Sequence, residues 1–194
     1  MLWVAVAFLI SAPGKIEVTI NDGPNYRVTP KILDVLDRHC VKARWFISGN
    51  MLRDRRHRPW LKEIVRRGHS LGNHLWSHLS PCKIGVSMVL RELKRTEKMI
   101  YQLTNIKTRR YRPPYGHMCK AVSRAVRREG YGIYLWDVCD QRKSAALTWK
   151  RARTILKRRG KVVLLFHKNW MKLDGVLDMA AKEGYIGCKM TTKN

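Results

Sequence analysis

Four polar segments of this sequence contain side-chain types that can bind a metal ion, stabilise charge or transfer protons. The first is Asn21-Asp22-Gly23-Pro24, and the second contains His74 and His78 at a spacing of i and i+4. Two imidazoles at this spacing can meet one cation from a helical turn, and an Asp oxygen completes a ligand set suited to Zn²⁺. Taken singly, the first segment also fits an ordinary turn, and the two histidines could be unrelated.

The other two segments supply groups for charge stabilisation and proton transfer. In Arg112-Pro113-Pro114-Tyr115-Gly116, two prolines fix the backbone after an arginine, which holds the guanidinium where a carboxylate or an oxyanion can use it. His167 directly follows the apolar run Val162–Phe166, and an imidazole there can act as a general acid near neutral pH. A core or capping histidine is the alternative interpretation.

These segments need a scaffold, and the sequence predicts strands that alternate with helices. Short apolar runs predict strands at Ile16–Ile20, Ala43–Ile47, Gly132–Trp136 and Val162–Phe166, with a candidate last strand at Tyr185–Gly187. Amphipathic spacing predicts helices at Pro30–Cys40, Pro59–Arg67, Val86–Leu103, Lys120–Glu129, Thr148–Arg159 and Asp174–Glu183. The alternation favours an α/β fold with a parallel sheet, in which polar residues at the strand ends form the site.

Composition describes a folded and strongly basic protein. The chain has 194 residues, 45% of them hydrophobic, which suits one domain and excludes a disordered or collagen-like chain. No apolar run reaches the roughly 18 residues that a membrane span needs. The 40 Lys and Arg against 14 Asp and Glu give a net charge of +26, which favours polyanionic partners: nucleic acid, anionic wall polymer or a membrane surface.

The basic residues are spread over many predicted helices and form no nucleic-acid-binding motif. A generally basic surface is therefore favoured over a dedicated nucleic-acid site.

The five cysteines point away from a thiolate zinc site. They lie far apart, without a C-x-x-C pair, at Cys40, Cys82, Cys119, Cys139 and Cys188. The odd number leaves at least one thiol unpaired, and we interpret most of them as buried free thiols.

The N-terminus has two interpretations. Met1–Ile10 is an apolar decamer of suitable length for a signal peptide but without a basic start, and it also fits a buried first strand. We expect a signal or terminal segment at 1–14 and a single domain at 15–194.

Together and in this order, the four segments resemble the polysaccharide deacetylase family (carbohydrate esterase family 4, the NodB-homology domain). The resemblance runs from about Ile16 to Tyr185 and includes the connecting text TPKILDVLDRHCVKARWFISGN, IVRRGHSLGNHLWSH and YRPPYG. It implies a distorted (β/α) barrel, commonly of seven strands. It also implies removal of N-acetyl or O-acetyl groups from polysaccharides such as chitin, chitooligosaccharides, peptidoglycan or acetylxylan, and hence a secreted or cell-wall location.

The resemblance also implies a role for each site residue. The family motif T-F-D-D-G-P falls on Thr19–Pro24, which makes Asp22 a metal ligand together with His74 and His78 of the H-x-x-x-H pair. The implied ion is Zn²⁺ or another divalent cation such as Co²⁺. Arg112 would orient the catalytic base, the Tyr115 backbone N–H would hold the oxyanion, and His167 would protonate the departing amine.

The sequence departs from the family in its proton-transfer residues. The base position, an Asp in the family, is Asn21, and a neutral amide cannot take a proton from water at pH 7. The family's Asp-Trp pair, six and seven residues after a Trp, falls here on Arg142 and Lys143. Asp140 or Asp137 could replace that Asp beside His167, which is followed by Lys168 instead of the family's common Asp.

Two functional hypotheses follow. In the first, the protein is a metal-dependent deacetylase of N-acetylglucosamine-containing polysaccharide, impaired by Asn21. In the second, it is an inactive family member that keeps the fold and the metal and binds acetylated glycan or an anionic polymer.

Overall fold

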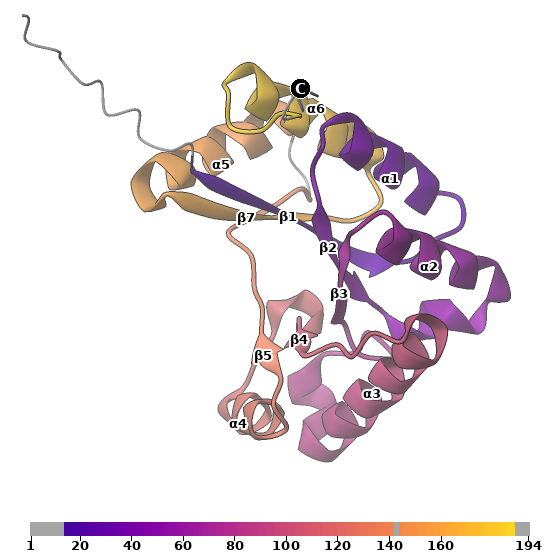
Figure 1. The fold of residues 1–194 in the computed structure, drawn as a ribbon. Helices are drawn as coiled ribbons and strands as arrows, with labels where there is room; N and C mark the ends of the chain where they lie inside the picture. The colour runs from indigo at the N-terminus through magenta and orange to yellow at the C-terminus, as the bar shows by residue number, and fades with distance from the viewer. Residues whose placement is uncertain (1–13, 142–143, 189–194) are drawn as a thin grey trace, which may run out of the picture.

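Seven strands form one parallel sheet in the computed structural model, which describes residues 14–141 and 144–188. The strands are β1 (Lys15–Gly23), β2 (Ala43–Ile47), β3 (Ser70–Asn73), β4 (Arg110–Tyr111), β5 (Gly132–Ile133), β6 (Val138–Cys139) and β7 (Lys161–Phe166). Their order is β5-β4-β3-β2-β1-β7-β6, and every pairing is parallel. The sheet curls into an open barrel, as Figure 1 shows, which confirms the predicted α/β barrel of seven strands.

In the described residues, six helices surround the curled sheet (Figure 1). They are α1 (Thr29–Arg38), α2 (Arg58–Arg66), α3 (Pro81–Thr104), α4 (Lys120–Arg128), α5 (Ala145–Arg159) and α6 (Trp170–Lys182). Short 3₁₀ turns lie at η1 (Gly49–Arg53), η2 (Arg55–His57) and η3 (Pro114–Gly116).

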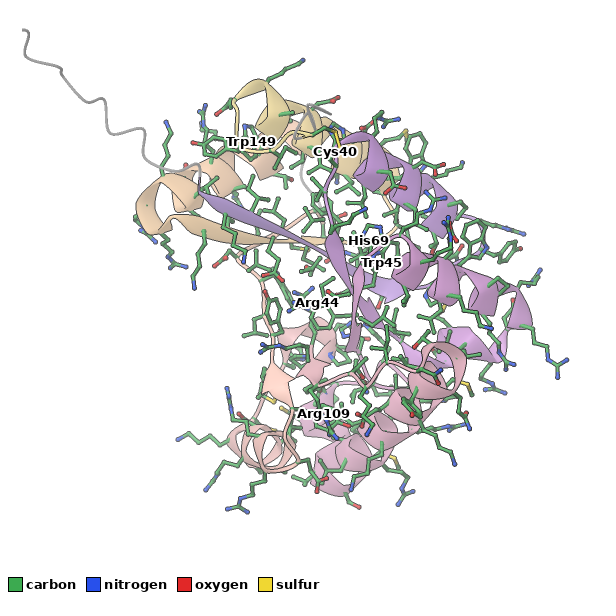
Figure 2. All side chains as sticks on the ribbon, viewed as in Figure 1. Cys40, Arg44, Trp45, His69, Arg109 and Trp149 are labelled. Atoms are coloured by element: carbon green, nitrogen blue, oxygen red, sulfur yellow. A yellow bond between two sulfur atoms is a disulfide. The ribbon has the colours of Figure 1, made fainter. Side chains whose placement is uncertain are left out.

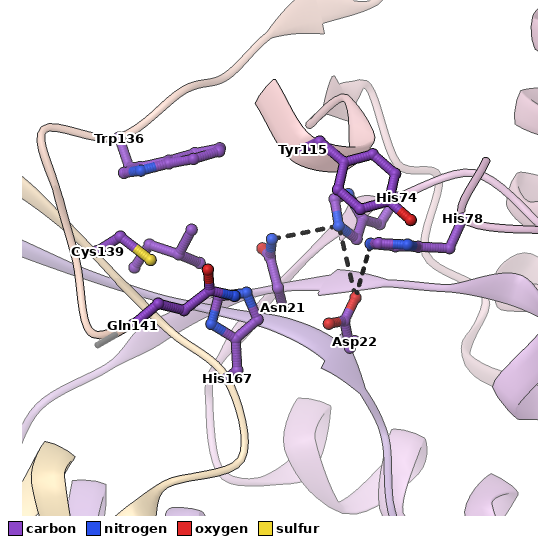
Figure 3. Close-up of a pocket in the computed structure, with 10 residues that line it drawn as sticks. Asn21, Asp22, His74, His78, Tyr115, Trp136, Cys139, Gln141 and His167 are labelled. Carbon is purple, nitrogen blue, oxygen red and sulfur yellow. Dashed lines mark hydrogen bonds and ion pairs between the residues drawn. The ribbon is translucent and has the colours of Figure 1, made fainter. Parts of the chain in front are cut away.

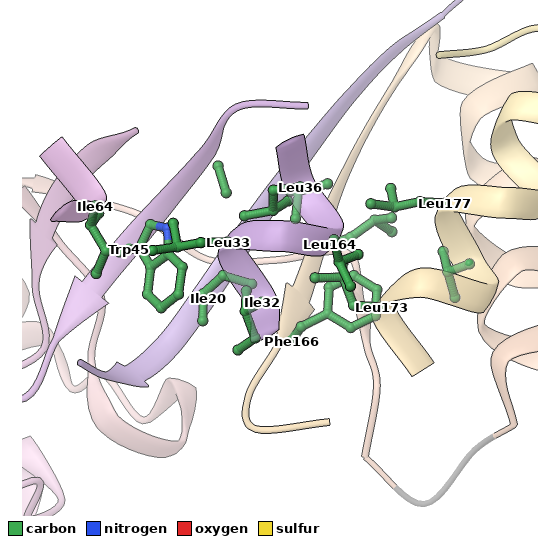
Figure 4. Close-up of a cluster of buried hydrophobic side chains, with 14 of the residues drawn as sticks. Ile20, Ile32, Leu33, Leu36, Trp45, Ile64, Leu164, Phe166, Leu173 and Leu177 are labelled. Carbon is green, nitrogen blue, oxygen red and sulfur yellow. The ribbon is translucent and has the colours of Figure 1, made fainter. Parts of the chain in front are cut away.

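The two faces of β1 have different partners because successive side chains of a strand point to opposite sides. Val18 and Ile20 join the main core, in which residues of α1 and α6 pack against β1, β2 and β7 (Figure 4). Thr19 and Asn21 lie on the other face, where both accept hydrogen bonds from the buried Arg112. The strand thus contributes one face to stability and the other to the site.

The long apolar strands and all six helices lie where the sequence predicts them, within a few residues, but the short strands do not. Gly132–Trp136 forms a strand only over Gly132–Ile133, and Tyr185–Gly187 forms none. β3, β4 and β6 were absent from the prediction. β3 contains Gly72, at which an added Cβ would lie 2.6 Å from the Phe46 ring. The close packing therefore requires glycine, and a glycine weakens the sequence pattern from which a strand is predicted.

The interpretation of most cysteines as buried free thiols is wrong. Cys40 and Cys188 form a disulfide that joins the end of α1 to the C-terminal segment (Figure 2 labels Cys40). Cys82 is exposed, and Cys119 and Cys139 are half-buried, so none of the five is buried. Cys40 follows α1 in a left-handed turn at φ 54°, which places it at the surface within reach of a segment 148 residues further along.

The sequence raised two further points, the segment at 1–14 and the ability to cross a membrane. The signal or terminal segment at 1–14 lies, except for Gly14, outside the described residues. Within the described part of the chain, no helix combines the length and the apolar character that a membrane crossing requires.

His69 makes the stability of the fold depend on pH. Its Nδ1 accepts a hydrogen bond from the Ala43 backbone N–H at 3.1 Å, and burial, with a smaller contribution from Lys42, lowers the pKa of the imidazole to about 4. The unfolded chain therefore binds more protons than the folded one between pH 6.5 and 4, so the free energy of unfolding falls as the pH drops through this window. We expect a contribution of roughly 2 to 3 kcal/mol, measured by urea unfolding.

His69→Asn keeps an acceptor near the Ala43 N–H but cannot titrate, so this variant should lose part of the pH dependence. His117→Asn, at an exposed histidine, is the matched control. Equal slopes of unfolding free energy against pH in His69→Asn and wild type would contradict the prediction.

Candidate metal and catalytic site

The end of β1 carries the first two site residues. The strand does not end in a turn at Asn21, as the sequence suggests, but continues to Gly23 with an irregular register against β2 between Asn21 and Gly23. Asp22 adopts a left-handed conformation at φ 62°, so the alternation of side chains is interrupted there. Asn21 and Asp22 consequently both line the same pocket.

His74 and His78 approach Asp22 from the loop that follows β3. The Asp22 Oδ1 atom lies 3.5 Å from His74 Nε2 and 3.3 Å from His78 Nε2, and the three ligand atoms lie within 4.8 Å of one another (Figure 3). This spacing lets one small cation reach all three atoms, and one carboxylate with two imidazoles is a ligand set that Zn²⁺ accepts. The residues therefore fit the divalent cation that the sequence predicts.

The loop geometry differs from the helical turn expected for an i, i+4 histidine pair. Residues 74–80 form neither helix nor strand, and Leu75 and His78 have positive φ angles of 63° and 61°. Side chains hold this loop: Asn73 Oδ1 accepts from the Leu75 N–H, and Glu92 accepts from the N–H groups of Trp76 and Ser77. The buried Glu92 of α3 thus supports the backbone between the two histidines.

The hydrogen bond at its other ring nitrogen gives His74 the tautomer that a metal ligand needs. Nδ1 lies 2.7 Å from the Arg112 carbonyl oxygen, which can only accept, so Nδ1 carries the proton and Nε2 presents its lone pair. His74 is 1% exposed, and burial lowers its pKa to about 4 despite the nearby Asp22. The imidazole is therefore neutral at physiological pH, the form that binds a metal.

Arg112 is fully buried beside Asn21. Its Nη1 donates to Thr19 Oγ1 at 2.8 Å and Asn21 Oδ1 at 3.0 Å, while the rest of the guanidinium donates to the carbonyls of Tyr134 and Leu135. Burial lowers its pKa, but the group keeps its charge at neutral pH. Because Arg112 occupies the amide oxygen, Asn21 directs Nδ2 toward His74 Nε2 at 3.2 Å.

The candidate acid His167 lies across the same pocket. Its Nδ1 is 3.0 Å from Asp140 Oδ1, and Asp140 is buried, with its own carbonyl accepting from Lys172 Nζ. Of the two acids proposed from the sequence, only Asp140 reaches His167. Asp137 instead accepts from Arg159 and from the Val163 backbone N–H.

The Arg112–Gly116 segment closes one side of the pocket. Tyr115 has a left-handed backbone at φ 60°, and its exposed ring contacts the His78 ring at a centroid distance of 4.9 Å. An added Cβ at Gly116 would lie 3.0 Å from the Trp136 ring, which explains the small residue at this position.

The structure brings all predicted site residues except Arg112 and Asp140 to the wall of one pocket of about 220 Å³ (Figure 3). Arg112 and Asp140 are hydrogen-bonded to the wall residues Asn21 and His167, respectively. Sequence reasoning missed four wall residues, Trp136, Cys139, Gln141 and Leu165. Leu165 lies in the predicted strand Val162–Phe166, whose uniformly apolar pattern does not show which side chains face the pocket, and the other three belong to the irregular stretch around β6.

Comparison with known proteins identifies a family and individual relatives whose descriptions agree with one another. Residues 11–134 match the family model of polysaccharide deacetylases. The chain is 34% identical over 125 residues to the peptidoglycan-N-acetylglucosamine deacetylase PgdA of Listeria monocytogenes, covering 64% of this chain and 26% of that protein. It is 31% identical over 140 residues to the peptidoglycan-N-acetylglucosamine deacetylase of Bacillus cereus, covering 70% and 50%. The chain thus spans between about a quarter and a half of the length of these relatives.

Solved structures show the same fold. Bacillus subtilis PdaA, a family 4 carbohydrate esterase, aligns with a TM-score of 0.74 at 25% identity over 88% of this chain and 76% of that chain. A family 4 pseudoenzyme from Bacillus anthracis aligns with a TM-score of 0.75 at 24% identity over 89% and 62%. With the family model matching more than half of its length, the chain belongs to the polysaccharide deacetylase family.

Proposed function

We propose that this protein is a metal-dependent N-deacetylase of N-acetylglucosamine-containing polysaccharide whose rate is limited by Asn21 at the base position. The observation that supports it is the convergence of Asp22, His74 and His78 opposite His167 in one pocket. A cation, Zn²⁺ or Co²⁺, held by these three side chains would polarise the acetyl carbonyl and activate water.

The remaining residues have separate tasks in this proposal. Tyr115 lines the pocket, and its backbone N–H would donate to the oxygen on which negative charge develops. His167 protonates the departing amine. Asp140 holds the imidazole in position by accepting a hydrogen bond from the Nδ1–H of His167. Arg112 holds the side chain of residue 21 by its oxygen, as it would hold the carboxylate of a base.

Asn21 favours a second candidate function. Its amide cannot accept a proton, and the loss of a general base lowers a rate by about 10² to 10⁴. If the remaining rate is negligible, the protein would bind acetylated glycan or anionic polymer without converting it, and the metal triad would serve recognition.

Peptidoglycan is the substrate that we favour, because the curated relatives named above are peptidoglycan deacetylases and because a net charge of +26 attracts an anionic wall. A cell-wall or secreted location follows from this substrate and agrees with the Cys40–Cys188 disulfide, since such bonds persist in oxidising compartments. We place the deacetylase domain at residues 15–194.

Acetate release tests the proposal. The full chain, loaded with Zn²⁺ or Co²⁺, is incubated with peptidoglycan glycan strands and with N-acetylchitooligosaccharides, and His74→Ala serves as the control. Acetate above the His74→Ala level supports the enzyme. Glycan binding without acetate release would establish the second candidate.

Asp140→Asn tests the positioning role of Asp140. The amide can present its NH₂ group to His167 Nδ1 and thereby stabilise the wrong tautomer, so kcat should fall about 10- to 100-fold while KM changes little. The measurement is steady-state acetate release in an Asn21→Asp background, where the rate is expected to be highest. Asp137→Asn is the control. It removes a carboxylate of the same segment, one that accepts from Arg159 instead of His167, and kcat should stay within about twofold of the Asn21→Asp background. Equal losses in the two variants would contradict the assignment.

A further inference from the structure

A second and larger cavity adjoins the candidate catalytic pocket. Its volume is about 560 Å³, and it lies between the segment Trp136–Cys139 and helix α5. Trp136 and Cys139 line both cavities, so the two share a wall. Figure 3 shows both residues on the side of the candidate catalytic pocket away from His78.

Trp136 is a well-supported part of that wall. The Arg112 guanidinium lies 5.4 Å from the centre of its ring, and Gly116 packs so closely that an added Cβ would be 3.0 Å away. A large aromatic ring in the shared wall offers a flat apolar surface on which a sugar ring can stack.

The opposite wall is one face of α5. Leu147, Lys150, Arg151, Thr154 and Ile155 line the cavity at the spacing i, i+3, i+4, i+7 and i+8 of a single helical stripe. Lys150 and Arg151 are exposed, and within the described parts of the chain neither forms an ion pair.

The one acid in this cavity is already neutralised. Asp137 lies in the wall, but its two oxygens accept from Arg159 Nη1 at 3.2 Å and from the Val163 N–H at 2.8 Å. The cavity therefore has two cations whose charge no described carboxylate balances, and it favours an anionic ligand.

We propose that this cavity binds the sugar next to the acetylated unit and that Lys150 and Arg151 recognise a carboxylate on it, of the kind that N-acetylmuramic acid carries in its lactyl group. The inference rests on the proposed function for the placement of the acetylated unit. It adds a specificity determinant for anionic glycan that lies outside the four motif segments.

The test compares two ligands of equal length. The full chain is titrated calorimetrically with an N-acetylglucosaminyl-N-acetylmuramic acid oligosaccharide and with the same compound after conversion of its lactyl carboxylates to amides. Wild type should bind the carboxylate form about tenfold more tightly, and 0.5 M NaCl should remove most of that difference.

Lys150→Gln/Arg151→Gln should bind both forms with the affinity that wild type has for the amide. The matched control Lys157→Gln/Arg158→Gln removes the same charge from exposed positions of α5 that do not line the cavity, and it should keep the tenfold preference. Equal affinity of wild type for the two ligands, or equal loss of preference in both double variants, would overturn the inference.

The same proteins separate this inference from the proposed function. A preference for the carboxylate ligand without acetate release would contradict the proposed deacetylase activity and support the anionic subsite. Acetate release without a preference for the carboxylate ligand would support the proposed deacetylase activity and contradict the anionic subsite.

Discussion

Asn21→Asp should raise the rate of acetate release by about 10² to 10⁴. The structure is arranged for this carboxylate, since Arg112 Nη1 already donates to Asn21 Oδ1 at 3.0 Å and the side chain is 5% exposed. An aspartate in the same position would keep that hydrogen bond, pair its charge with the buried guanidinium and provide the missing proton acceptor.

The gain should have the pH dependence of an added base. The rate of Asn21→Asp should fall at low pH as the new carboxylate becomes protonated, and this acidic limb should be absent from the wild-type profile. The measurement is kcat/KM for acetate release against pH, with both proteins loaded with the same metal.

Asn25→Asp is the matched control for Asn21→Asp. It introduces the same change four residues further along, where the side chain accepts from the Arg27 backbone N–H and does not reach Arg112. Its rate should stay at the wild-type level. If Asn21→Asp is folded, binds the metal and releases no more acetate than Asn25→Asp, then the proposal that Asn21 limits the rate is wrong.

Removal of one imidazole from the metal triad should weaken metal binding by at least about 100-fold. His78→Ala is the best variant, because His78 is half-buried at the pocket rim and its loss leaves the hydrogen bond between His74 and Arg112 intact. With Co²⁺, wild type should develop the visible absorption of a bound ion at one equivalent, whereas His78→Ala should not. This readout requires no turnover and so applies even if the protein is inactive.

His117→Ala controls for the loss of any histidine near the pocket. His117 contacts the Tyr115 ring at 5.7 Å but does not belong to the triad, so its Co²⁺ spectrum and affinity should match wild type. A normal Co²⁺ spectrum in His78→Ala would show that the ion binds elsewhere.

The main elements were predictable because their signals are local. Val162–Phe166 is apolar enough to be buried on both faces, and helices such as Pro59–Arg67 carry their own stop at Gly68. Strands β4 and β6 contain two residues each, too few for any periodicity, and they exist because longer neighbours pair with them. The Cys40–Cys188 disulfide was missed because spacing along the chain does not reveal which surface segments meet.

The choice between Asp137 and Asp140 shows what only strand pairing decides. In the sequence both acids precede His167 by similar distances and fit equally well. In the structure the Asp137 N–H donates to the Val163 carbonyl and the Asp140 N–H donates to that of Leu165, so the register of β6 against β7 places Asp140 beside His167.

By itself, the sequence determined the family, the three metal-ligand candidates and the Asn at the expected base position, because residue type and order in the motifs carry that information. Tertiary structure alone decided which groups meet: the Asn21 amide oriented by Arg112, the Asp140 carboxylate beside His167, and the basic cavity that shares Trp136 with the candidate catalytic pocket. These contacts join residues from different strands and helices, and their positions depend on how the sheet curls and how α5 packs against it.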